Sequence, residues 1–466
     1  MLFSSLVFIF AFLPALCAAY YCIPNRTYRN VLLCVSSLFF YAWGEPRYIV
    51  LMLASITVNY FFGRGIGESS SEAARKIQLV LAVVCNLAAL GFFKYSGFFV
   101  RNVNVLCGTA FSLPSLPLPI GISFYTFQAL SYIIDVYRKK TASQKNFLNL
   151  TLYISLFPQL IAGPIVRYTD IETEITGRCE TFDSFINGLE QFILGLAEKV
   201  IIANNMAVIA DGVFDGYKDA GASVLWIAAL AYTFQIFFDF AGYSRMAIGL
   251  GKMFGFHFPQ NFNYPYVARS VTDFWRRWHM TLSSWFKDYV YIPLGGSRCS
   301  RIKLARNIMI TWLLTGFWHG AEWNFVLWGF YYAVLLLAEK LITGKLLLKV
   351  PAILAAPVTL FFVVVGWVIF RTTNMTDLFA ILHRMFTPSG IPVRQYIAEH
   401  AAVMSRMFFF IPAVLALIPA LKPAYHKLHA HTAGFAVELV CCVCLFAASL
   451  CMLVASTYNP FIYFRF

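Results

Sequence analysis

The chain has 466 residues, of which 60% are hydrophobic and 12% are charged, and its mean hydropathy is +0.68. Soluble domains carry about 25% charged residues, so this composition excludes a water-soluble globular protein. Disorder, collagen and coiled coil are excluded too, because apolar residues dominate without a heptad or glycine repeat. We therefore expect a polytopic, all-α membrane protein with one integral domain over residues 1–466.

The net charge is +14, and much of it lies in residues 243–307, which hold ten Lys and Arg and two Asp. The positive-inside rule makes a cytoplasmic or interfacial segment the simplest interpretation. Anionic lipid or a phosphate-bearing cofactor is the alternative partner for this charge. Nucleic acid is excluded, because no nucleic-acid-binding motif accompanies the charge.

The first apolar stretch covers residues 1–21. No positive residue precedes its core, and further apolar spans follow at short intervals, so we expect a transmembrane helix and not a cleaved signal peptide. Arg26 and Arg29 follow this stretch, and the loop 63–76 is also basic. Both loops are expected in the cytoplasm, which places the N-terminus outside.

Many further apolar spans follow, and some of them are interrupted. Pro158, Gly163 and Pro164 interrupt one span, and Gly316 and Gly320 interrupt another. Because non-helical backbone at membrane depth must be buried in protein or solvated by a cavity, we expect the spans to enclose a cavity. No internal repeat supports an inverted-repeat transporter. The expected spans are 31–43, 47–62, 77–93, 120–136, 147–166, 185–210, 222–241, 308–337, 352–370, 407–421 and 435–455.

Residues 270–294 follow a different pattern, which predicts an amphipathic helix lying in the membrane interface. A continuous helix places seven apolar or aromatic residues on one face and the charged residues elsewhere. The seven are Val271, Phe274, Trp275, Trp278, Leu282, Trp285 and Tyr289. The Pro-Leu-Gly-Gly turn at 293–296 ends the helix.

Two histidines stand out, because a titratable group at membrane depth is costly and is by default a functional hypothesis. His319 lies in a long apolar run between Gly316 and Gly320, which we expect to leave room for a ligand. It is either a core histidine bonded to a backbone carbonyl or to Glu322, or a general base for an attacking hydroxyl. His279 lies at the border of the apolar face of the interfacial helix. Two histidines without further ligands do not make a metal site, and we expect none.

Asp239 is a carboxylate among phenylalanines, in the run Phe-Phe-Asp-Phe-Ala-Gly-Tyr at 237–243. A buried carboxylate needs a partner, and the candidates are Arg245 and a backbone amide. A purely structural polar contact is the alternative to a functional role. The same choice applies to Gln128 and Gln235.

The C-terminal residues 458–466 read Tyr-Asn-Pro-Phe-Ile-Tyr-Phe-Arg-Phe. Terminal tails are usually polar and frayed. This aromatic tail is expected to dock into the protein or the membrane interface, with an interfacial anchor as the simplest role.

Six motifs then follow one another in a specific order. They are Gly-Ile-Ser-Phe-Tyr-Thr-Phe-Gln (121–128), Phe-Pro-Gln-Leu-Ile-Ala-Gly-Pro (157–164), Phe-Asp-Phe-Ala-Gly-Tyr-Ser (238–244), Asp-Phe-Trp-Arg-Arg-Trp-His (273–279), Tyr-Ile-Pro-Leu-Gly-Gly (291–296) and Gly-Phe-Trp-His-Gly-Ala (316–321). With them the chain resembles the membrane-bound O-acyltransferases over nearly its whole length, and most closely their bacterial alginate and peptidoglycan O-acetyltransferase branch. Arg245 departs from the pattern, because an acidic residue is expected after Gly-Tyr-Ser. This departure leaves the partner of Asp239 open.

The resemblance implies a ring of about 11–12 tilted transmembrane helices around a tunnel, with interfacial amphipathic helices beside it. His319 matches the family's catalytic histidine, and His279 matches a second active-site position on the cytoplasmic side. Tyr463 is the candidate acyl relay, because the tail in this branch is thought to present its tyrosine to the tunnel. The residues expected to line the tunnel or bind the donor are Trp318, Asp239, Gln128, Arg276, Arg277 and Trp275.

The task that the resemblance implies is transfer of an acyl group, with acetyl favoured, from a cytoplasmic thioester donor such as acetyl-CoA. The acceptor is expected to be an extracytoplasmic cell-envelope polysaccharide of a bacterium, reached through an extracytoplasmic hydrolase-like acetyltransferase partner. No permanently bound cofactor is expected. Transfer of D-alanine from a carrier protein to teichoic acid is the alternative within this class. A membrane transporter and a scaffold are the alternatives outside it.

Overall fold

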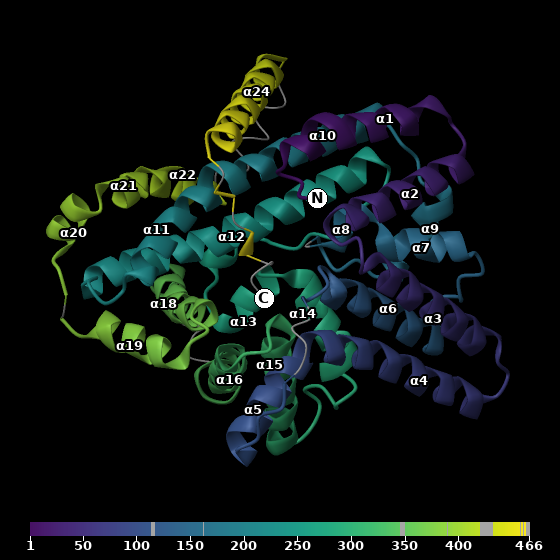
Figure 1. Cartoon of the computed structure of the whole chain (residues 1–466), viewed down its shortest axis with the longest axis horizontal. Coiled ribbons are helices and arrows are strands. Elements are labelled where there is room, and N and C mark those ends of the chain that lie inside the picture. The colour runs from purple at the N-terminus through teal and green to yellow at the C-terminus, as the bar shows by residue number, and fades with distance from the viewer. Residues whose placement is uncertain are drawn as a thin grey trace. The chain divides into compact units, whose positions relative to one another are not determined.

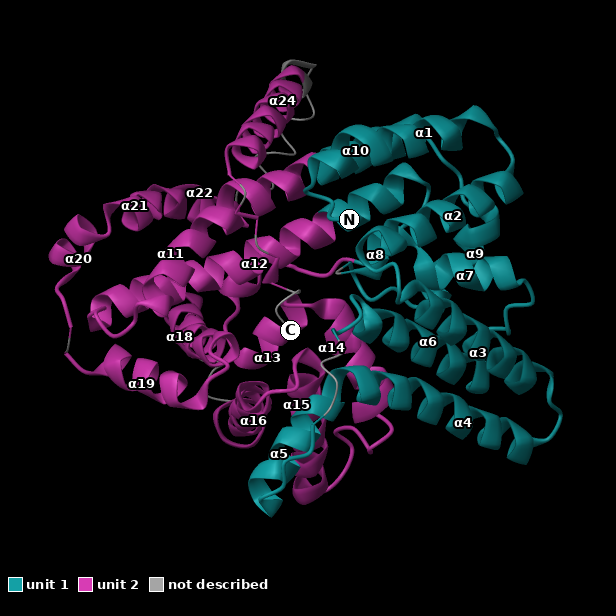
Figure 2. Cartoon of the chain, in the orientation of Figure 1, with its two compact units in different colours: residues 1–192, 246–259 teal, residues 193–245, 260–466 magenta. Residues whose placement is uncertain are grey.

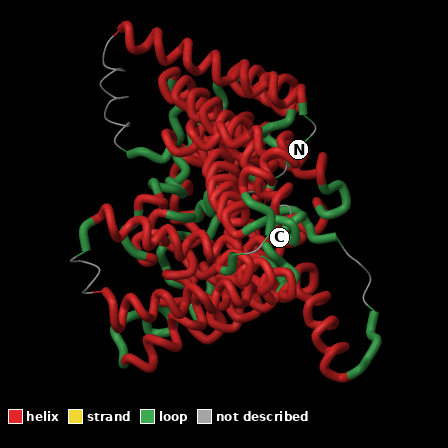
Figure 3. Tube along the Cα trace, turned by 90° about the vertical axis from the view of Figure 1, so that its left-hand side faces the viewer, coloured by secondary structure: helices red, strands yellow, loops and turns green. Residues whose placement is uncertain are grey.

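The computed structural model describes residues 1–112, 117–161, 163–344, 350–388, 390–419, 432–456, 458–459 and 461–462. These residues form helices and connecting loops, and no β-strand of two or more paired residues occurs among them (Figure 3). The chain divides into two compact units, which Figure 2 colours separately. Residues 1–192 and 246–259 form the first, and residues 193–245 and 260–466 form the second. The single domain over residues 1–466 stays a prediction, because each unit is described by itself.

The first unit contains the N-terminal helices, which are purple and blue in Figure 1. Asn59 and Asn86 exchange side-chain hydrogen bonds of 2.8 and 3.0 Å inside it, which satisfies both amides in an apolar contact. The helices are η1 (Phe8–Phe12), α1 (Leu13–Cys22), α2 (Arg26–Gly44), α3 (Ile49–Glu68), α4 (Glu72–Leu90), η2 (Gly91–Tyr95), α5 (Ser96–Cys107), α6 (Ile122–Tyr137), α7 (Phe147–Ser155), α8 (Phe157–Leu160), α9 (Tyr168–Gly177) and the start of α10 (Phe182–Ala197).

The second unit contains the remaining helices, together with residues 222–245 of the long helix α12 (Ala222–Met253). Its core is aromatic, and Trp328 and Trp367 are among the largest fully buried side chains. The other helices are η3 (Glu198–Ala203), α11 (Asn204–Asp215), η4 (Pro265–Val267), α13 (Val271–Arg277), α14 (Met280–Phe286), η5 (Lys287–Tyr291), α15 (Arg301–His319), α16 (Trp323–Ala338), η6 (Glu339–Thr343), α18 (Ala352–Arg371), α19 (Met375–Phe386), α20 (Val393–Glu399), α21 (Ala401–Met404), η7 (Ser405–Phe409), α22 (Phe410–Ala416) and α24 (Thr432–Ala455).

Seven helical stretches of the described chain are long and apolar enough to cross a membrane, or eight if the bent pair Val393–Glu399 and Ala401–Ala416 is one span. The predicted all-α polytopic membrane protein is therefore confirmed. The prediction of 11–12 spans exceeds this number, because several expected spans form shorter helices, such as α6 with 16 residues. The seven are Ile49–Glu68, Glu72–Cys107, Phe182–Asp215, Ala222–Met253, Trp323–Thr343, Ala352–Arg371 and Ala436–Ala455.

The span expected at 308–337, with an interruption at Gly316 and Gly320, consists of two helices, because α15 and α16 form a hairpin that turns at Gly320–Glu322. Gly316 and Gly320 were also expected to leave room for a ligand, and this expectation is wrong. A Cβ atom at Gly316 would overlap the carbonyl oxygen of Phe325, and one at Gly320 would overlap its ring. The two glycines therefore make room for α16, and His319 comes to lie at the last position of α15.

The predicted continuous helix over 270–294 is also wrong. The helix breaks between α13 and α14 at His279, whose φ of 43° lies in the left-handed region. The loop residue Asn261 replaces the lost helical hydrogen bonds, because its carbonyl oxygen accepts from the backbone amide of Met280 at 2.9 Å. The apolar face itself is present, since all seven predicted residues are buried.

Candidate active site

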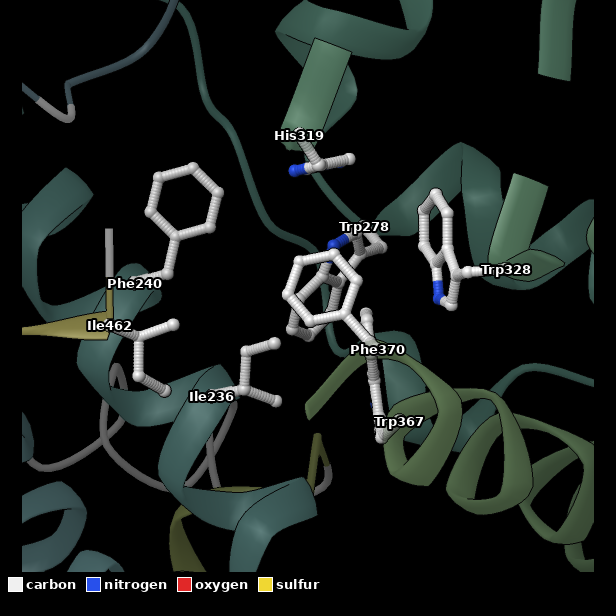
Figure 4. A pocket seen from close by; sticks show the side chains of 8 residues that line it. All are labelled: Ile236, Phe240, Trp278, His319, Trp328, Trp367, Phe370 and Ile462. Carbon is white, nitrogen blue, oxygen red and sulfur yellow. The ribbon is translucent and has the colours of Figure 1, made fainter. Parts of the chain in front are cut away.

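His319 projects from the end of α15 into a small apolar cavity in the second unit (Figure 4). Its side chain is buried, and its ring centroid lies 4.9 Å from that of Trp318, 5.2 Å from Trp328 and 5.1 Å from Phe370. The cavity has a volume of about 10 Å³, roughly the room needed for one water molecule. Its walls are Ile236, Phe240, Trp278, His319, Trp328, Trp367, Phe370 and Ile462.

The tail residue Ile462 is one of the walls of this cavity, and Figure 4 shows it across the cavity from His319. Ile462 follows the last transmembrane candidate and is only 3% exposed. The residue after it is Tyr463, which lies outside the described residues, as do Arg465 and Phe466. Residue 462 of the C-terminal tail therefore lines the same cavity as the predicted catalytic histidine.

His279 is held at the break between α13 and α14 by a polar cluster around Asn261. The Oδ1 atom of Asn261 accepts from His279 Nδ1 at 3.0 Å and from the hydroxyl of Thr281 at 2.9 Å. The amide nitrogen of Asn261 donates to the hydroxyl of Ser244, within the Gly-Tyr-Ser motif, at 3.1 Å. An amide oxygen can only accept, so the His279 proton is on Nδ1 and Nε2 keeps its lone pair. Burial lowers the pKa of His279 to about 3, which keeps the ring neutral.

Aromatic rings connect the two histidines. Trp318 contacts both, with ring centroids 4.9 Å from His319 and 6.2 Å from His279. Phe240 of α12 packs edge-on against His279 at 4.6 Å and also lines the His319 cavity. Trp275 belongs to the aromatic core of the same unit, where its ring centroid lies 4.7 Å from that of Trp312. The predicted residues His279, Trp318 and His319 thus belong to one cluster.

A second cavity of about 690 Å³ lies beside α13, η5 and α15, and it is basic. Arg269, Arg276, Lys287 and Lys340 line it together with the carboxylates Asp273 and Glu339. Trp275 also lines it, and so does Thr315, one helical turn before His319. Of the two adjacent arginines, Arg276 lines the cavity, whereas Arg277 forms an ion pair of 2.9 Å with Asp273 and is not among the lining residues. The volume is within the range of small-molecule sites.

Among the described residues Asp239 has two partners, and Arg245 is not one of them. Lys199 of η3 approaches Asp239 Oδ1 to 2.7 Å, and the backbone amide of Ile462 donates to Oδ2 at 2.8 Å. The prediction of Arg245 is wrong, because Arg245 pairs with Glu198 at 2.9 Å. A backbone amide was the other predicted partner. Lys199 was not predicted, since an isolated lysine in an apolar helix gives no clue to a partner 40 residues away.

Gln128 lies on α6 in the first unit and is 1% exposed, and its relation to the His319 cavity of the second unit stays a prediction. Its backbone carbonyl accepts from the hydroxyl of Tyr153 at 3.4 Å, and its side-chain oxygen has no hydrogen-bond partner in the part of the chain that the structure describes. Gln235 of α12 is also buried, and its side-chain oxygen likewise has no hydrogen-bond partner among the described residues. Its role, like that of Gln128, stays a prediction.

Comparison with known proteins decides the family. A sequence model of the membrane-bound O-acyltransferase family matches residues 132–379, more than half of the chain. The chain belongs to the membrane-bound O-acyltransferase family. The protein named probable alginate O-acetylase AlgI of Pseudomonas aeruginosa is 42% identical over 393 residues, which cover 83% of this chain and 75% of that protein. The peptidoglycan O-acetyltransferase of Helicobacter pylori is 36% identical over 441 residues, 87% of this chain and 84% of that protein.

A more distant relative is the teichoic acid D-alanyltransferase of Bacillus subtilis, which is 31% identical over 230 residues, 47% of this chain and 58% of that protein. As a membrane-bound O-acyltransferase, the protein is a multi-pass membrane enzyme that transfers an acyl group to a hydroxyl. The matched region contains His279, His319 and the basic cavity's Arg276. Sequence reasoning missed Asn261 and Glu339. Glu339 accepts from the Thr272 amide at 2.8 Å and so caps α13, but it is distant in sequence from the motif that it supports.

Proposed function

We propose that this enzyme moves an acetyl group from a cytoplasmic thioester donor towards O-acetylation of a cell-envelope polysaccharide, in the cytoplasmic membrane of a bacterium. The observation that carries the proposal is the cavity in which His319 and the tail residue Ile462 face each other. The relatives named for alginate and peptidoglycan acetylation support acetyl as the acyl group and polysaccharide as the final acceptor.

The basic cavity supports a donor with phosphate groups. Arg269, Arg276, Lys287 and Lys340 supply positive charge at its walls, and acetyl-CoA carries phosphates at one end and a thioester at the other. Aromatic and threonine side chains continue the same cavity along α15 to Thr315. A donor bound with its phosphates at the arginines would therefore direct its thioester towards the turn that carries His319.

His319 is proposed as the general base. It takes a proton from an attacking hydroxyl while the hydroxyl oxygen forms a bond to the thioester carbonyl carbon. Collapse of the tetrahedral intermediate breaks the carbon–sulfur bond, and the thiolate recovers the proton from the imidazolium. His279, neutral and fixed by Asn261, is proposed to position or polarise the donor, since its Nε2 has no hydrogen-bond partner among the residues that the structure describes.

The first acceptor is proposed to be the hydroxyl of Tyr463. A phenol has a reference pKa near 10, so it is easier to deprotonate than an alkyl alcohol. The resulting aryl ester is still an activated ester, and its transfer to a serine of an extracytoplasmic hydrolase-like partner, and then to a sugar hydroxyl, is downhill. The position of Ile462 at the His319 cavity supports this relay, because Tyr463 is its direct neighbour in the chain.

Mass spectrometry of the C-terminal peptide tests the proposal, with the enzyme purified from a producing strain. The native chain, Tyr463→Phe and His319→Ala are compared. An acetyl adduct on Tyr463 that disappears in both variants is the expected result. If no adduct forms and acetyl-CoA turnover is intact in Tyr463→Phe, the relay is wrong and transfer is direct.

The distant similarity to a D-alanyltransferase supports a second candidate function, which is transfer of D-alanine from a carrier protein. An alanyl adduct on the same peptide would select it. A transporter is separated by labelled acetyl-CoA, because a transporter would leave the label on the donor.

A further inference from the structure

The C-terminal tail lies against η3, α11 and α12 along a row of polar contacts in the second unit. The hydroxyl of Tyr458 donates to Asp211 of α11, and the Asn204 side chain donates to Asn459 at 3.2 Å. The ring of Phe461 packs on Tyr243 of α12 at 4.7 Å. The last contact is the hydrogen bond of 2.8 Å from the Ile462 amide to Asp239. Each of the described tail residues 458, 459, 461 and 462 therefore has a specific contact with these helices.

The Lys199–Asp239 ion pair lies at the end of this row, and it is nearly inaccessible to solvent. Each side chain is 2% exposed, and both lie on helices that qualify as membrane spans. Lys199 also donates to Asn204 at 2.9 Å, which connects the pair to the contact made by Asn459. A buried ion pair is weak evidence for stability, because apolar residues of similar size often stabilise a fold as well or better. Ionisable residues within spans are functional hypotheses by default.

The backbone around the pair is shaped to bring its members together. Lys199 lies in a π-helical turn, a distortion that is frequent at functional sites. Gly242, one turn after Asp239, allows α12 to approach α10 closely, since a Cβ atom there would lie 2.7 Å from the carbonyl oxygen of Gly195. A larger residue at Gly242 would separate α12 from the helix that continues into Lys199.

The two oxygens of the Asp239 carboxylate have different partners, and this difference indicates its role. Oδ1 forms the ion pair with Lys199, and Oδ2 accepts the hydrogen bond from the tail. A carboxylate accepts a stronger hydrogen bond from a backbone N–H than a neutral oxygen does. The hydrogen bond to Asp239 is made by a backbone amide. It therefore fixes which tail residue lies at Asp239, and it does not depend on the identity of that residue's side chain. A slip by one residue would move an extended tail by about 3.3 Å and replace Ile462 at the His319 cavity.

We infer that the Lys199–Asp239 pair is a binding site for the C-terminal tail, and that Asp239 is a positioning residue that fixes residue 462 at the His319 cavity. The docking rests on the contacts above alone. Its consequence for catalysis rests on the proposed relay through Tyr463, because a fixed residue 462 limits where the next side chain can reach.

Two matched double variants test the site. Lys199→Gln with Asp239→Asn removes both charges and retains an acceptor for the Ile462 amide, while the glutamine can still donate to Asn204. Lys199→Gln with Asp239→Leu removes the same charges and the acceptor. Hydrogen–deuterium exchange of the C-terminal peptide, resolved to single amides by fragmentation, reports the Ile462 bond directly.

We expect the Ile462 amide to exchange slowly in the native enzyme and in the Asn double variant, and about tenfold or more faster in the Leu double variant. Equal exchange in the two double variants, whether fast or slow, overturns the inference, because the acceptor at 239 would then not decide docking. The thermal midpoints of the two variants show that both are folded.

The acetyl adduct on the tail gives the catalytic readout. The adduct is expected to be retained in the Asn double variant and lost in the Leu double variant, at equal donor occupancy. If the proposed relay is wrong, no adduct forms even in the native enzyme, and the exchange experiment still decides the docking. If the docking is wrong, the native adduct forms and both double variants retain it equally.

Discussion

The Nδ1 atom of His279 donates a hydrogen bond of 3.0 Å to the side-chain oxygen of Asn261, 18 positions earlier in the chain. This bond holds a histidine whose backbone lies in the left-handed region, a conformation that costs of order 1–3 kcal/mol and clusters at functional sites. The same asparagine bonds Thr281 and Ser244, so one side chain joins α12, the loop before α13 and α14. The geometry of His279 is therefore imposed by its surroundings.

The neutral state of His279 predicts a pH-dependent stability. Its pKa is lowered to about 3 in the folded chain and is near 6.5 when unfolded, so below pH 6.5 the unfolded state binds more protons. The free energy of unfolding therefore decreases as the pH falls from about 6.5 towards 3, by up to about 1.4 kcal/mol per pH unit. Thermal midpoints in detergent, recorded between about pH 4 and pH 8, measure this slope.

His279→Gln is expected to flatten that slope, because glutamine does not titrate. His383→Gln is the matched control, since His383 is exposed on α19 and the native slope should persist. Parallel curves for the native enzyme and His279→Gln would contradict the neutral, buried state of His279.

Removal of the proposed base is expected to slow transfer strongly without unfolding the protein. General-base catalysis contributes about 10²–10⁴-fold, so His319→Ala and His319→Gln should each lower acetyl transfer from labelled acetyl-CoA by that factor. Thermal midpoints should remain close to the native value, because His319 lies at the end of α15 beside its small cavity. His383→Gln should retain native activity. Native-like transfer in His319→Gln would remove the general-base role.

The α15–α16 hairpin gives a prediction about packing. In Gly316→Ala the added methyl group would overlap the carbonyl oxygen of Phe325, and overpacking of this kind costs roughly 1–3 kcal/mol. The thermal midpoint should fall, and activity should fall with it, because His319 is three residues further along α15. Gly177→Ala is the control, since Gly177 ends α9 with no neighbouring atom within 4 Å of an added Cβ. An unchanged midpoint in Gly316→Ala would show that α15 and α16 can separate without cost.

The sequence predicted the class of fold, because apolar composition and short motifs determine it. It also named His279, Trp318 and His319, which the structure brings together, while their catalytic roles stay predictions. It did not predict the break at His279, since the hydrogen bonds that replace the helix come from Asn261, outside the helix pattern. The apolar face of 270–294 was still predicted correctly, because the burial pattern survives a break of one residue.

The sequence also did not predict which residues from distant parts of the chain contact one another. Asp239 and Lys199 lie on different helices, and nothing in either local pattern links them, so the nearer Arg245 was the natural candidate. The glycines on either side of His319 were expected to leave room for a ligand, although they allow the close approach of α16, the second helix of the hairpin. Both errors concern contacts between helices, which hydropathy and spacing do not encode.

The adjacent arginines 276 and 277 test the basic cavity, because they differ in environment and carry equal charge. Arg276 lines the cavity, whereas Arg277 forms an ion pair with Asp273. Loss of one charge-assisted contact to a donor phosphate costs about 1.4 kcal/mol or more, which is a tenfold change in affinity. Arg276→Gln should therefore raise the KM for acetyl-CoA about tenfold with little change in kcat, and the native KM should increase with ionic strength.

Arg277→Gln removes the same charge and should change the KM by less than about threefold, because long-range attraction alone is screened by salt. Steady-state kinetics at two salt concentrations provide both values. Equal effects of the two substitutions would mean that the donor senses only the overall positive charge of residues 243–307. The cavity would then not be the phosphate site, and the donor would approach His319 from elsewhere.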